Sequence, residues 1–441
     1  MSTSRLPILE TDPSHFIRAV TDLGSQRPVI TTQAIFNVHG IKVLENGTAI
    51  QPNLYDRLMQ HRLSAPLEDC VTSVPSITSA IVQESVAQAL ERVPLYERMF
   101  GDIDSRALLL ESVARIPLPN AIAFQLTLAC EMRPKLYAHL IDTALVAGWL
   151  AMDPPQPSHA RVVHATTVGL LHDIGMLHLD PVLLDYRQEI DQALQRELWT
   201  HPIISHLLAD HQHVYPKDVL QGILDHHEFM DGSGYPRALS AHDLGPMARI
   251  LALTELVAGA NANGRMLTEH RLSVMLRMTM HRYDHDLAKR VLELLRPYPE
   301  VIGSTRPLLD NPAAHLLAIH AVLAQWPQQW SAQTTPTERH SADFAFIADQ
   351  VLGLQHNLAR VGAAPEHLDQ LGDTQPDRIL HTELTLLVEE ATWQLRAIER
   401  QTRQRWHGEE GHELPAHLAQ WLQRVNATVA NCNLAVLPSS G

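Results

Sequence analysis

The chain has 441 residues and a formal net charge of −15, and 45% of its residues are hydrophobic while 5% are aromatic. This length predicts two or three domains, and the few aromatic residues favour packed aliphatic helices over a β-sandwich. The negative charge argues against binding of nucleic-acid polymers, although a small anion can still bind in a locally positive pocket.

The sequence contains no signal for export or for membrane insertion. No apolar run reaches the roughly 18 residues that span a bilayer, and the N-terminus lacks a basic stretch followed by an apolar one. The three cysteines, Cys70, Cys130 and Cys432, are scattered, which is typical of thiols in a reducing compartment. We therefore expect a cytoplasmic protein without membrane contact.

Residues 1–117 are expected to form a small mixed α/β module with connecting helices. Two short β-prone runs lie around Gly40 and the turn signal Asn46-Gly47, and together they predict a hairpin. The segments 53–58 and 77–100 follow with helical patterns.

Residues 118–298 are predicted to form an all-α domain, because apolar residues recur there at helical spacing between short breaks marked by Pro or Gly. Within it, the stripe Leu287, Val291, Leu292 and Leu295 is interpreted as helix core. Residues 299–441 are predicted to hold a linker (299–312) and a helical region of unknown role, including an amphipathic helix over 383–400. The acidic, glutamine-rich helices of this region are expected to form a solvated face or a homodimer interface. The predicted fold class is mainly α.

The pair His172-Asp173 is the first candidate for chemistry. Its apolar lead-in, Gly169-Leu170-Leu171, predicts that the pair lies at the buried end of a helix, and Gly175 permits a turn or close packing just after it. The imidazole can bind one metal ion while the carboxylate bridges two. An isolated His-Asp pair is common, so the interpretation depends on the residues that accompany it.

Further candidate ligands recur at regular intervals on either side of this pair. Two helices of about 12 residues, each about 18 Å long, bring the chain back to its starting level roughly every 25 to 30 residues. Ligands spaced in this way can converge at one end of a helical domain, where bundles commonly hold metals. The candidates stand 33, 29, 26 and 28 residues apart: His139, His172, His201, His227 and Glu255.

The ligand types narrow the choice of metal. Mixed imidazole and carboxylate ligands suit Fe, Mn or Zn better than Ca or Mg, and the absence of cysteine among them excludes a structural zinc finger. More than four or five ligands imply at least two ions. Such a pair can activate water and neutralise phosphate oxygens, as in two-metal phosphodiester hydrolysis.

The order of these motifs resembles a known family. His172-Asp173-Ile174-Gly175 is followed by His226-His227-Glu228 and then by Asp231-Gly232-Ser233-Gly234-Tyr235-Pro236. Over about residues 120–297 this series is similar to the HD-GYP phosphodiesterases, a branch of the HD superfamily of metal-dependent phosphohydrolases. The resemblance implies an all-helical fold, two divalent ions (Fe or Mn), and hydrolysis of cyclic di-GMP to linear pGpG or GMP in bacterial second-messenger signalling. It also implies that Asp173 is catalytic and bridges the ions, with metal ligands at the matching positions: His139, His172, Asp173, His201, His226, His227 and Glu255.

The resemblance further implies a substrate-binding region. The Gly-Tyr-Pro loop would line the substrate pocket or dock a signalling-protein partner. Met176 stands where the family usually has Lys, and Arg265 is the nearest match to the arginines that usually follow the final ligand. Glu255 replaces the usual Asp, and Lys135 occupies the place of a Glu that supports a third metal in some relatives. The expected substrate contacts are Asp231, Gly234, Tyr235, Pro236, Met176 and Arg265.

Two functions remain open. The complete ligand set favours an active cyclic-dinucleotide phosphodiesterase, whereas Met176 and the poorly matched arginines favour a degenerate scaffold that binds metal, nucleotide or a signalling partner without useful turnover. Asp225 and Glu228 are expected to accept hydrogen bonds from ligating imidazoles. Five other histidines are expected to be surface or structural residues: His164, His178, His206, His211 and His213.

Overall fold

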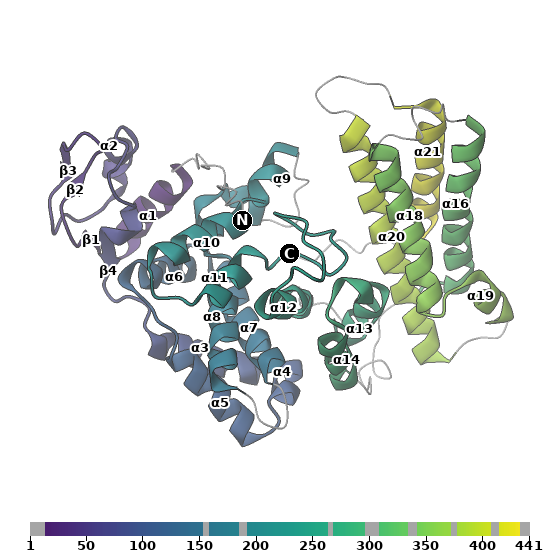
Figure 1. The fold of residues 1–441 in the computed structure, drawn as a ribbon, viewed down its shortest axis with the longest axis horizontal. Helices are drawn as coiled ribbons and strands as arrows, with labels where there is room; N and C mark the ends of the chain where they lie inside the picture. The colour runs from purple at the N-terminus through teal and green to yellow at the C-terminus, as the bar shows by residue number, and fades with distance from the viewer. Residues whose placement is uncertain are drawn as a thin grey trace. The chain divides into compact units, whose positions relative to one another are not determined.

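The computed structural model describes residues 14–152, 158–184, 192–262, 268–295, 308–333, 342–371, 377–406 and 414–432. By its internal contacts the chain divides into two units. The first comprises Met1–Ala262 and His281–Leu287, and the second comprises Asn263–Met280 and Ala288–Gly441. Both units are mainly helical (Figure 1). The predicted mainly α class is therefore confirmed, together with the small mixed module at the N-terminus and the helical C-terminal region. The division at residues 117 and 298 stays a prediction.

The N-terminal module contains two small antiparallel sheets. Strand β2 (Ile35–Phe36) pairs with β3 (Lys42–Leu44), which confirms the predicted hairpin. Strand β1 (Val29–Thr31) pairs with β4 (Val71–Ser73), a long-range pairing that no local turn signal indicates. The helical elements here are α1 (Ser14–Gln26), η1 (Pro52–Leu54), α2 (Tyr55–Met59) and η2 (Leu67–Asp69).

The remaining helices of the first unit begin and end at recognisable signals. Thr78 caps α3 by accepting a hydrogen bond from the backbone N–H of Ile81, and Asp102 caps α5 in the same way from Ser105. Pro134 lies in the first turn of α7, where its missing N–H costs nothing. The elements are α3 (Ser79–Arg92), α4 (Pro94–Met99), α5 (Ile103–Ala114), α6 (Asn120–Met132), α7 (Pro134–Ala151), α8 (His159–Leu171), η3 (Ile174–His178), η4 (Pro181–Leu184), α9 (Gln192–Leu198), α10 (His201–His211), α11 (Lys217–Leu224) and α12 (Pro246–Ala262).

Helix α7 is the central element of this unit. Every residue from Leu140 to Ala151 is buried, as expected for a helix that is apolar on all sides. It packs against α8 and α12, while α10 packs against η3 and α11 (Figure 1). These helices together position the candidate site.

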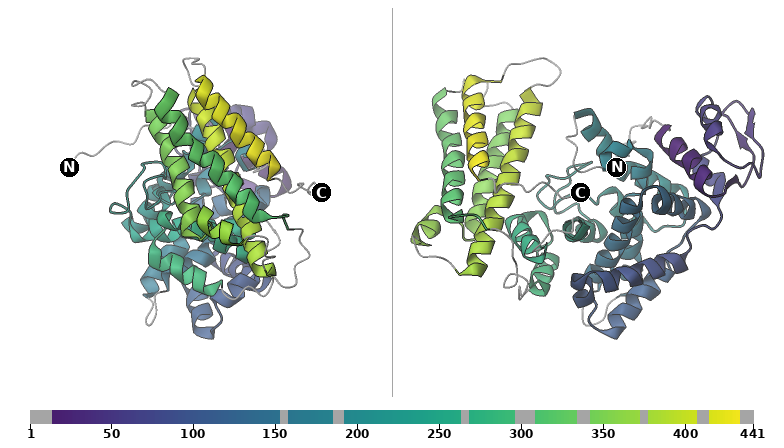
Figure 2. Two further views of the ribbon diagram at one scale, coloured as in Figure 1. Left: turned by 90° about the vertical axis from the view of Figure 1, so that its right-hand side faces the viewer. Right: turned by 180° about the vertical axis from the view of Figure 1, so that it is seen from behind.

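The second unit has its own hydrophobic core. Helices α16, α18, α20 and α21 run side by side, with α20 in contact with the other three (Figures 1 and 2). Trp421 is fully buried, and its indole N–H donates to the carbonyl of Val322 at 3.0 Å. The elements that lie wholly or partly in this unit are α13 (Thr268–Met278), η5 (Met280–Arg282), α14 (His285–Leu294), α16 (Pro312–Gln333), α18 (Ala342–Arg360), α19 (Pro365–Leu371), α20 (Arg378–Trp406) and α21 (Ala416–Asn431).

Several predictions for the later part of the chain can be compared with these elements. The amphipathic helix over 383–400 lies inside α20. Val291 and Leu295 are fully buried and Leu287 and Leu292 partly so, in agreement with a core stripe. Residues 299–307 of the predicted linker lie outside the described residues. Among the helices that the structure describes, none has the length and apolar character needed to cross a membrane.

Candidate metal centre

The His172-Asp173 pair lies at the end of α8, where the helix gives way to η3. A Cβ atom on Gly175 would lie 2.5 Å from the carbonyl oxygen of His201 and 2.8 Å from the backbone nitrogen of Ser205, so only glycine allows η3 to approach α10 this closely. The N–H of Gly175 also donates to the hydroxyl of Ser205 at 2.9 Å. The predicted close packing after the pair is confirmed, and it brings Asp173 next to the start of α10.

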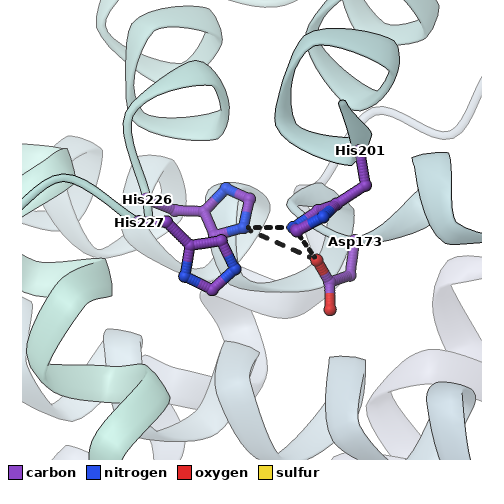
Figure 3. Close-up of side chains that lie close together, drawn as sticks. All are labelled: Asp173, His201, His226 and His227. Atoms are coloured by element: carbon purple, nitrogen blue, oxygen red, sulfur yellow. Dashed lines mark hydrogen bonds and ion pairs between the residues drawn. The ribbon is translucent and has the colours of Figure 1, made fainter. Parts of the chain in front are cut away.

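Seven side chains from five parts of the fold converge here. They come from α7, the end of α8, the start of α10, the end of α11 and the middle of α12. They form two groups, and within each group the potential ligand atoms lie within 4.8 Å of one another. One group, drawn in Figure 3, contains Asp173, His201, His226 and His227, and the other contains His139, His172 and Glu255. These are the seven residues that the sequence predicts, although their role as metal ligands stays a prediction.

The carboxylate of Asp173 connects the two groups. Its Oδ1 atom lies 3.1 Å from Nε2 of His201 and 3.5 Å from Nε2 of His226 (Figure 3). Its Oδ2 atom lies 3.4 Å from Nε2 of His172 and 3.7 Å from Nε2 of His139. Each oxygen therefore faces a different group, which is the arrangement that a bridging carboxylate needs.

Backbone carbonyls set the orientation of three imidazole rings. Nδ1 of His172, His201 and His226 each lies beside the carbonyl oxygen three residues earlier in the chain, at 2.8, 2.5 and 2.7 Å respectively. Because a carbonyl oxygen can only accept, each Nδ1 donates its hydrogen, and in the neutral ring Nε2 keeps its lone pair. Nε2 of His201 and Nε2 of His226 are 3.1 Å apart. Two lone pairs this close repel each other, and a cation bound to both nitrogens would remove that repulsion.

The carboxylates are equally suited to a cation. Oδ1 of Asp173 and Oε1 of Glu255 are buried, and as long as the surrounding imidazoles are neutral these atoms receive no hydrogen bond from the residues that the structure describes. Oε1 of Glu255 lies 3.0 Å from Nε2 of His172 and 3.4 Å from Nε2 of His139. Burying an acceptor without a hydrogen-bond donor costs free energy, unless a cation satisfies the acceptor instead. The donor set therefore fits divalent metal ions.

The protonation states agree with this interpretation. Burial alone would raise the pKa of Asp173, but the neighbouring His172 and His201 hold it well below its usual value. Burial likewise opposes the charge of Glu255, and His139 and His172 keep its pKa low. Burial, with the adjacent His226, lowers the pKa of His227 well below its usual value. Charged carboxylates and a neutral imidazole are the forms that bind metal.

The pKa values of His139 and His172 show that the site favours positive charge. Burial opposes their protonation, yet Asp173 and Glu255 raise the pKa of His172 well above its usual value, and Glu255 raises that of His139. The same negative potential would attract a divalent ion, and binding of that ion would displace the proton from each ring.

Asp225 and Glu228 do not hold the imidazoles, and this expectation was wrong. The buried carboxylate of Asp225 accepts two hydrogen bonds from Nη2 of Arg237, at 2.5 and 2.6 Å. Glu228 accepts the backbone N–H groups of Arg237 and Leu239 at 2.6 and 2.9 Å. Three of the imidazoles already have backbone acceptors in the helix that precedes them, and these two carboxylates instead fix the loop 228–239. Arg237 is a residue whose role no motif reveals.

The Gly-Tyr-Pro loop packs against the ligands. The ring of Tyr235 stacks on that of His227, with centroids 4.7 Å apart and an interplanar angle of 30°. Burial, followed by the charges of Asp173 and Glu255, raises the pKa of Tyr235 well above its usual value. A Cβ on Gly234 would lie 2.4 Å from the carbonyl oxygen of His227, so this close packing requires glycine. The Tyr235–Pro236 peptide bond is cis.

Asp231 anchors the other side of this loop. Its Oδ2 atom lies 3.4 Å from Nε2 of His281 and 3.6 Å from Nε of Arg282. Burial would raise its pKa, but His281 and Ser233 lower it to about 2. These contacts connect the loop to residues 281–287 of the same unit, so the structure gives Asp231 an anchoring position. A substrate contact by Asp231 stays a prediction.

The remaining predicted substrate contacts are Met176 and Arg265. Met176 lies in η3 with 7% of its surface exposed, and its N–H donates to the carbonyl of Asp173 at 3.0 Å. Arg265 lies outside the described residues. The five other histidines lie outside the two ligand groups. Their positions vary: His178 stacks on Phe16, His164 and His211 pair with aspartates, His206 lies beside the carbonyl oxygen of Leu220, and His213 has a positive φ of 55°.

Comparisons with known proteins agree with the site. Residues 142–287 match the HD domain family. The chain is 28% identical over 122 residues to a 3'3'-cGAMP-specific phosphodiesterase 3 of Vibrio cholerae, which is 28% of this chain and 25% of that protein. It is 24% identical over 123 residues to the cyclic di-GMP phosphodiesterase PdeB of Borreliella burgdorferi, which is 27% of this chain and 32% of that protein.

The chain thus matches about a quarter to a third of the length of these curated relatives. No solved structure matches it. Five helical segments nevertheless bring the ligand series together within or next to the matched region. Residues 142–287 therefore match the HD domain, and the two relatives support a metal-dependent phosphohydrolase of the HD superfamily, of the HD-GYP type.

Proposed function

We propose that this protein is a metal-dependent phosphodiesterase that hydrolyses a cyclic dinucleotide. The first candidate substrate is cyclic di-GMP, with linear pGpG or GMP as the product. The observation that carries the proposal is the Asp173 carboxylate, which directs one oxygen toward each of the two ligand groups. The two relatives support the substrate class, because both are named as cyclic-dinucleotide phosphodiesterases. The proposed setting is second-messenger signalling in the bacterial cytoplasm.

The proposed cofactors are two divalent ions, iron or manganese. His139, His172 and Glu255 would hold one, His201, His226 and His227 the other, and Asp173 would bridge them. Bound there, the ions would supply Lewis-acid stabilisation of the phosphate charge and activation of water. The imidazole and carboxylate donors match the preferences of these metals.

The residues of the chain orient and shield the reaction site. The Nδ1 hydrogen bonds of three histidines fix their ring planes before any ligand arrives, so little reorganisation is needed. Tyr235 covers one face of His227 and keeps water away from it. The Arg237–Asp225 pair fixes the loop that carries Tyr235. The side chains of the site are thus preorganised before any ligand binds.

The test is a product assay. Metal-loaded protein is incubated with cyclic di-GMP, 3'3'-cGAMP and cyclic di-AMP, and products are separated by chromatography. We expect linear dinucleotide or mononucleotide from at least one substrate, and none from Asp173→Ala. His213→Ala, which changes a histidine outside both ligand groups, is the matched control and should retain activity.

A second function, a binding scaffold without turnover, is favoured by one observation. Met176 supplies no charge where the resembled family has Lys, and it is buried three residues after Asp173. Such a scaffold would bind cyclic di-GMP in its metal-loaded form and release no product. The same assay, with bound nucleotide measured by equilibrium dialysis, separates the two. A signalling partner docked on the Gly-Tyr-Pro loop, and a homodimer, also stay predictions.

A further inference from the structure

Trp199 lies beside the candidate metal centre with its side chain partly in solvent. It directly follows α9 and stands two residues before His201. Its backbone is held, because its N–H donates to the carbonyl of Gln195 at 3.1 Å, yet 43% of its surface is exposed. An exposed indole next to a polar site offers a flat apolar face that an aromatic ligand can cover.

An aromatic series leads from the metal ligands to this side chain. The Trp199 ring lies 5.8 Å from that of Tyr235 at an interplanar angle of 32°. Tyr235 in turn stacks on His227 at 4.7 Å. Because His227 belongs to a ligand group, Trp199 is the exposed end of a series of rings that begins at the metal centre.

We propose that Trp199 is a base-stacking residue, on which one purine of the cyclic dinucleotide lies while a phosphate occupies the metal centre. The inference rests on the proposed function and adds how the substrate is held. A purine is flat, neutral and aromatic, so it matches the exposed indole, whereas the charged phosphate matches the ions. The ribose between base and phosphate separates the two contacts, as the series of rings separates the indole from the ligands.

The chemistry of stacking also predicts the specificity. Every base offers a π-face, so stacking tolerates guanine and adenine alike and binds the smaller pyrimidines less strongly. Trp199 therefore favours purine cyclic dinucleotides as a class and does not select cyclic di-GMP over 3'3'-cGAMP.

The experiment compares Trp199→Ala and Trp199→Phe with wild type in steady-state hydrolysis of cyclic di-GMP and cyclic di-UMP. Trp199→Ala should raise KM for cyclic di-GMP about tenfold with kcat nearly unchanged, because base stacking contributes to ground and transition state alike. Trp199→Phe should keep most of the affinity, and the loss on cyclic di-UMP should be smaller. The matched control is Trp393→Ala, since Trp393 is also exposed (59%) but belongs to α20 of the second unit.

Fluorescence provides a second measurement that does not depend on turnover. Of the seven tryptophans, only the one that stacks on a base should be quenched when the nucleotide binds. Titration of metal-loaded protein with the linear dinucleotide pGpG should quench wild type, and Trp199→Phe should abolish most of that quenching while Trp393→Phe does not.

The outcomes separate this inference from the proposed function. If fully metal-loaded wild type neither binds nor hydrolyses any cyclic dinucleotide, the proposed function fails. If wild type is active but Trp199→Ala keeps the wild-type KM, the stacking role is overturned. It is equally overturned if Trp199→Ala loses metal or melts well below wild type, since Trp199 would then be structural. A loss of affinity for cyclic di-UMP as large as that for cyclic di-GMP would also overturn it.

Discussion

The carboxylate of Asp173 and the imidazole of His201 lie on different elements, η3's N-terminal boundary and the start of α10, yet Oδ1 and Nε2 are 3.1 Å apart. Gly175 makes this proximity possible, because any side chain there would push η3 off α10. The Oδ2 atom of the same carboxylate faces His139 and His172. The proposed two-ion site therefore depends on a single side chain that both halves share.

Asp173→Ala should remove hydrolysis and leave the fold intact. Loss of the shared carboxylate separates the two ligand groups, and we expect activity to fall by about a hundredfold or more. Product formation and metal content report the loss, and circular dichroism reports the fold. Equal turnover by this variant and wild type would show that the activity arises elsewhere or from a contaminant.

Met176→Lys should raise kcat/KM on cyclic di-GMP by about tenfold, because an added cation near a phosphate tightens binding. The long side chain can extend its ammonium group from the buried position of Met176 toward solvent. Met176→Leu keeps the volume without the charge and should change little. An unchanged or slower Lys variant at equal metal content would mean that the pocket is built around an apolar side chain, and the scaffold function would then be favoured.

Arg237→Met should destabilise the loop that carries Tyr235. It leaves the carboxylate of Asp225, which is 1% exposed, without its cation, and we expect a loss of about 2 kcal/mol in the free energy of unfolding. Urea denaturation measures this. The control is Arg115→Met, whose partner Glu111 is 51% exposed, so its loss should be close to zero. Equal stability of the two variants would contradict an anchoring role for Arg237.

Glu68 should make stability fall as pH rises. Burial raises the pKa of this carboxyl group from 4.5 to about 7, so between these values the folded state binds more protons than the unfolded state. The penalty is absent below about pH 4.5 and complete above about pH 7. Glu68→Gln should therefore stabilise the protein by about 3 kcal/mol at pH 8 and hardly at all at pH 4. Glu45→Gln, at a position whose side chain is 70% exposed, is the control, and a pH-independent difference for Glu68→Gln would refute the assignment.

Much of the site could be predicted from the sequence, because its ligands recur about every thirty residues, and each lies in or directly next to a helix of the same domain. The hairpin at 35–44 could also be predicted, since its two strands are joined by a local turn. The β1–β4 pairing was not, because its strands are about forty residues apart and carry no shared signal.

The roles of polar residues next to the ligands were harder to predict. In the sequence, Asp225 and Glu228 stand next to His226 and His227, which suggests hydrogen bonds between them. Only the fold shows that Asp225 instead accepts from Arg237, and Glu228 from two backbone N–H groups. Trp199 was missed for a similar reason, because a lone tryptophan after a short helix predicts nothing until Tyr235 is seen beside it.

The most direct test of the account is the metal content of the protein after anaerobic purification. Elemental analysis should find about two transition-metal ions per chain, iron or manganese, because the seven side chains form two groups around one shared carboxylate. In Asp173→Ala the content should fall to about one ion or less. Less than about half an equivalent of iron, manganese and zinc together in the wild type, even after reconstitution, would contradict the metal centre and the phosphodiesterase function proposed for it.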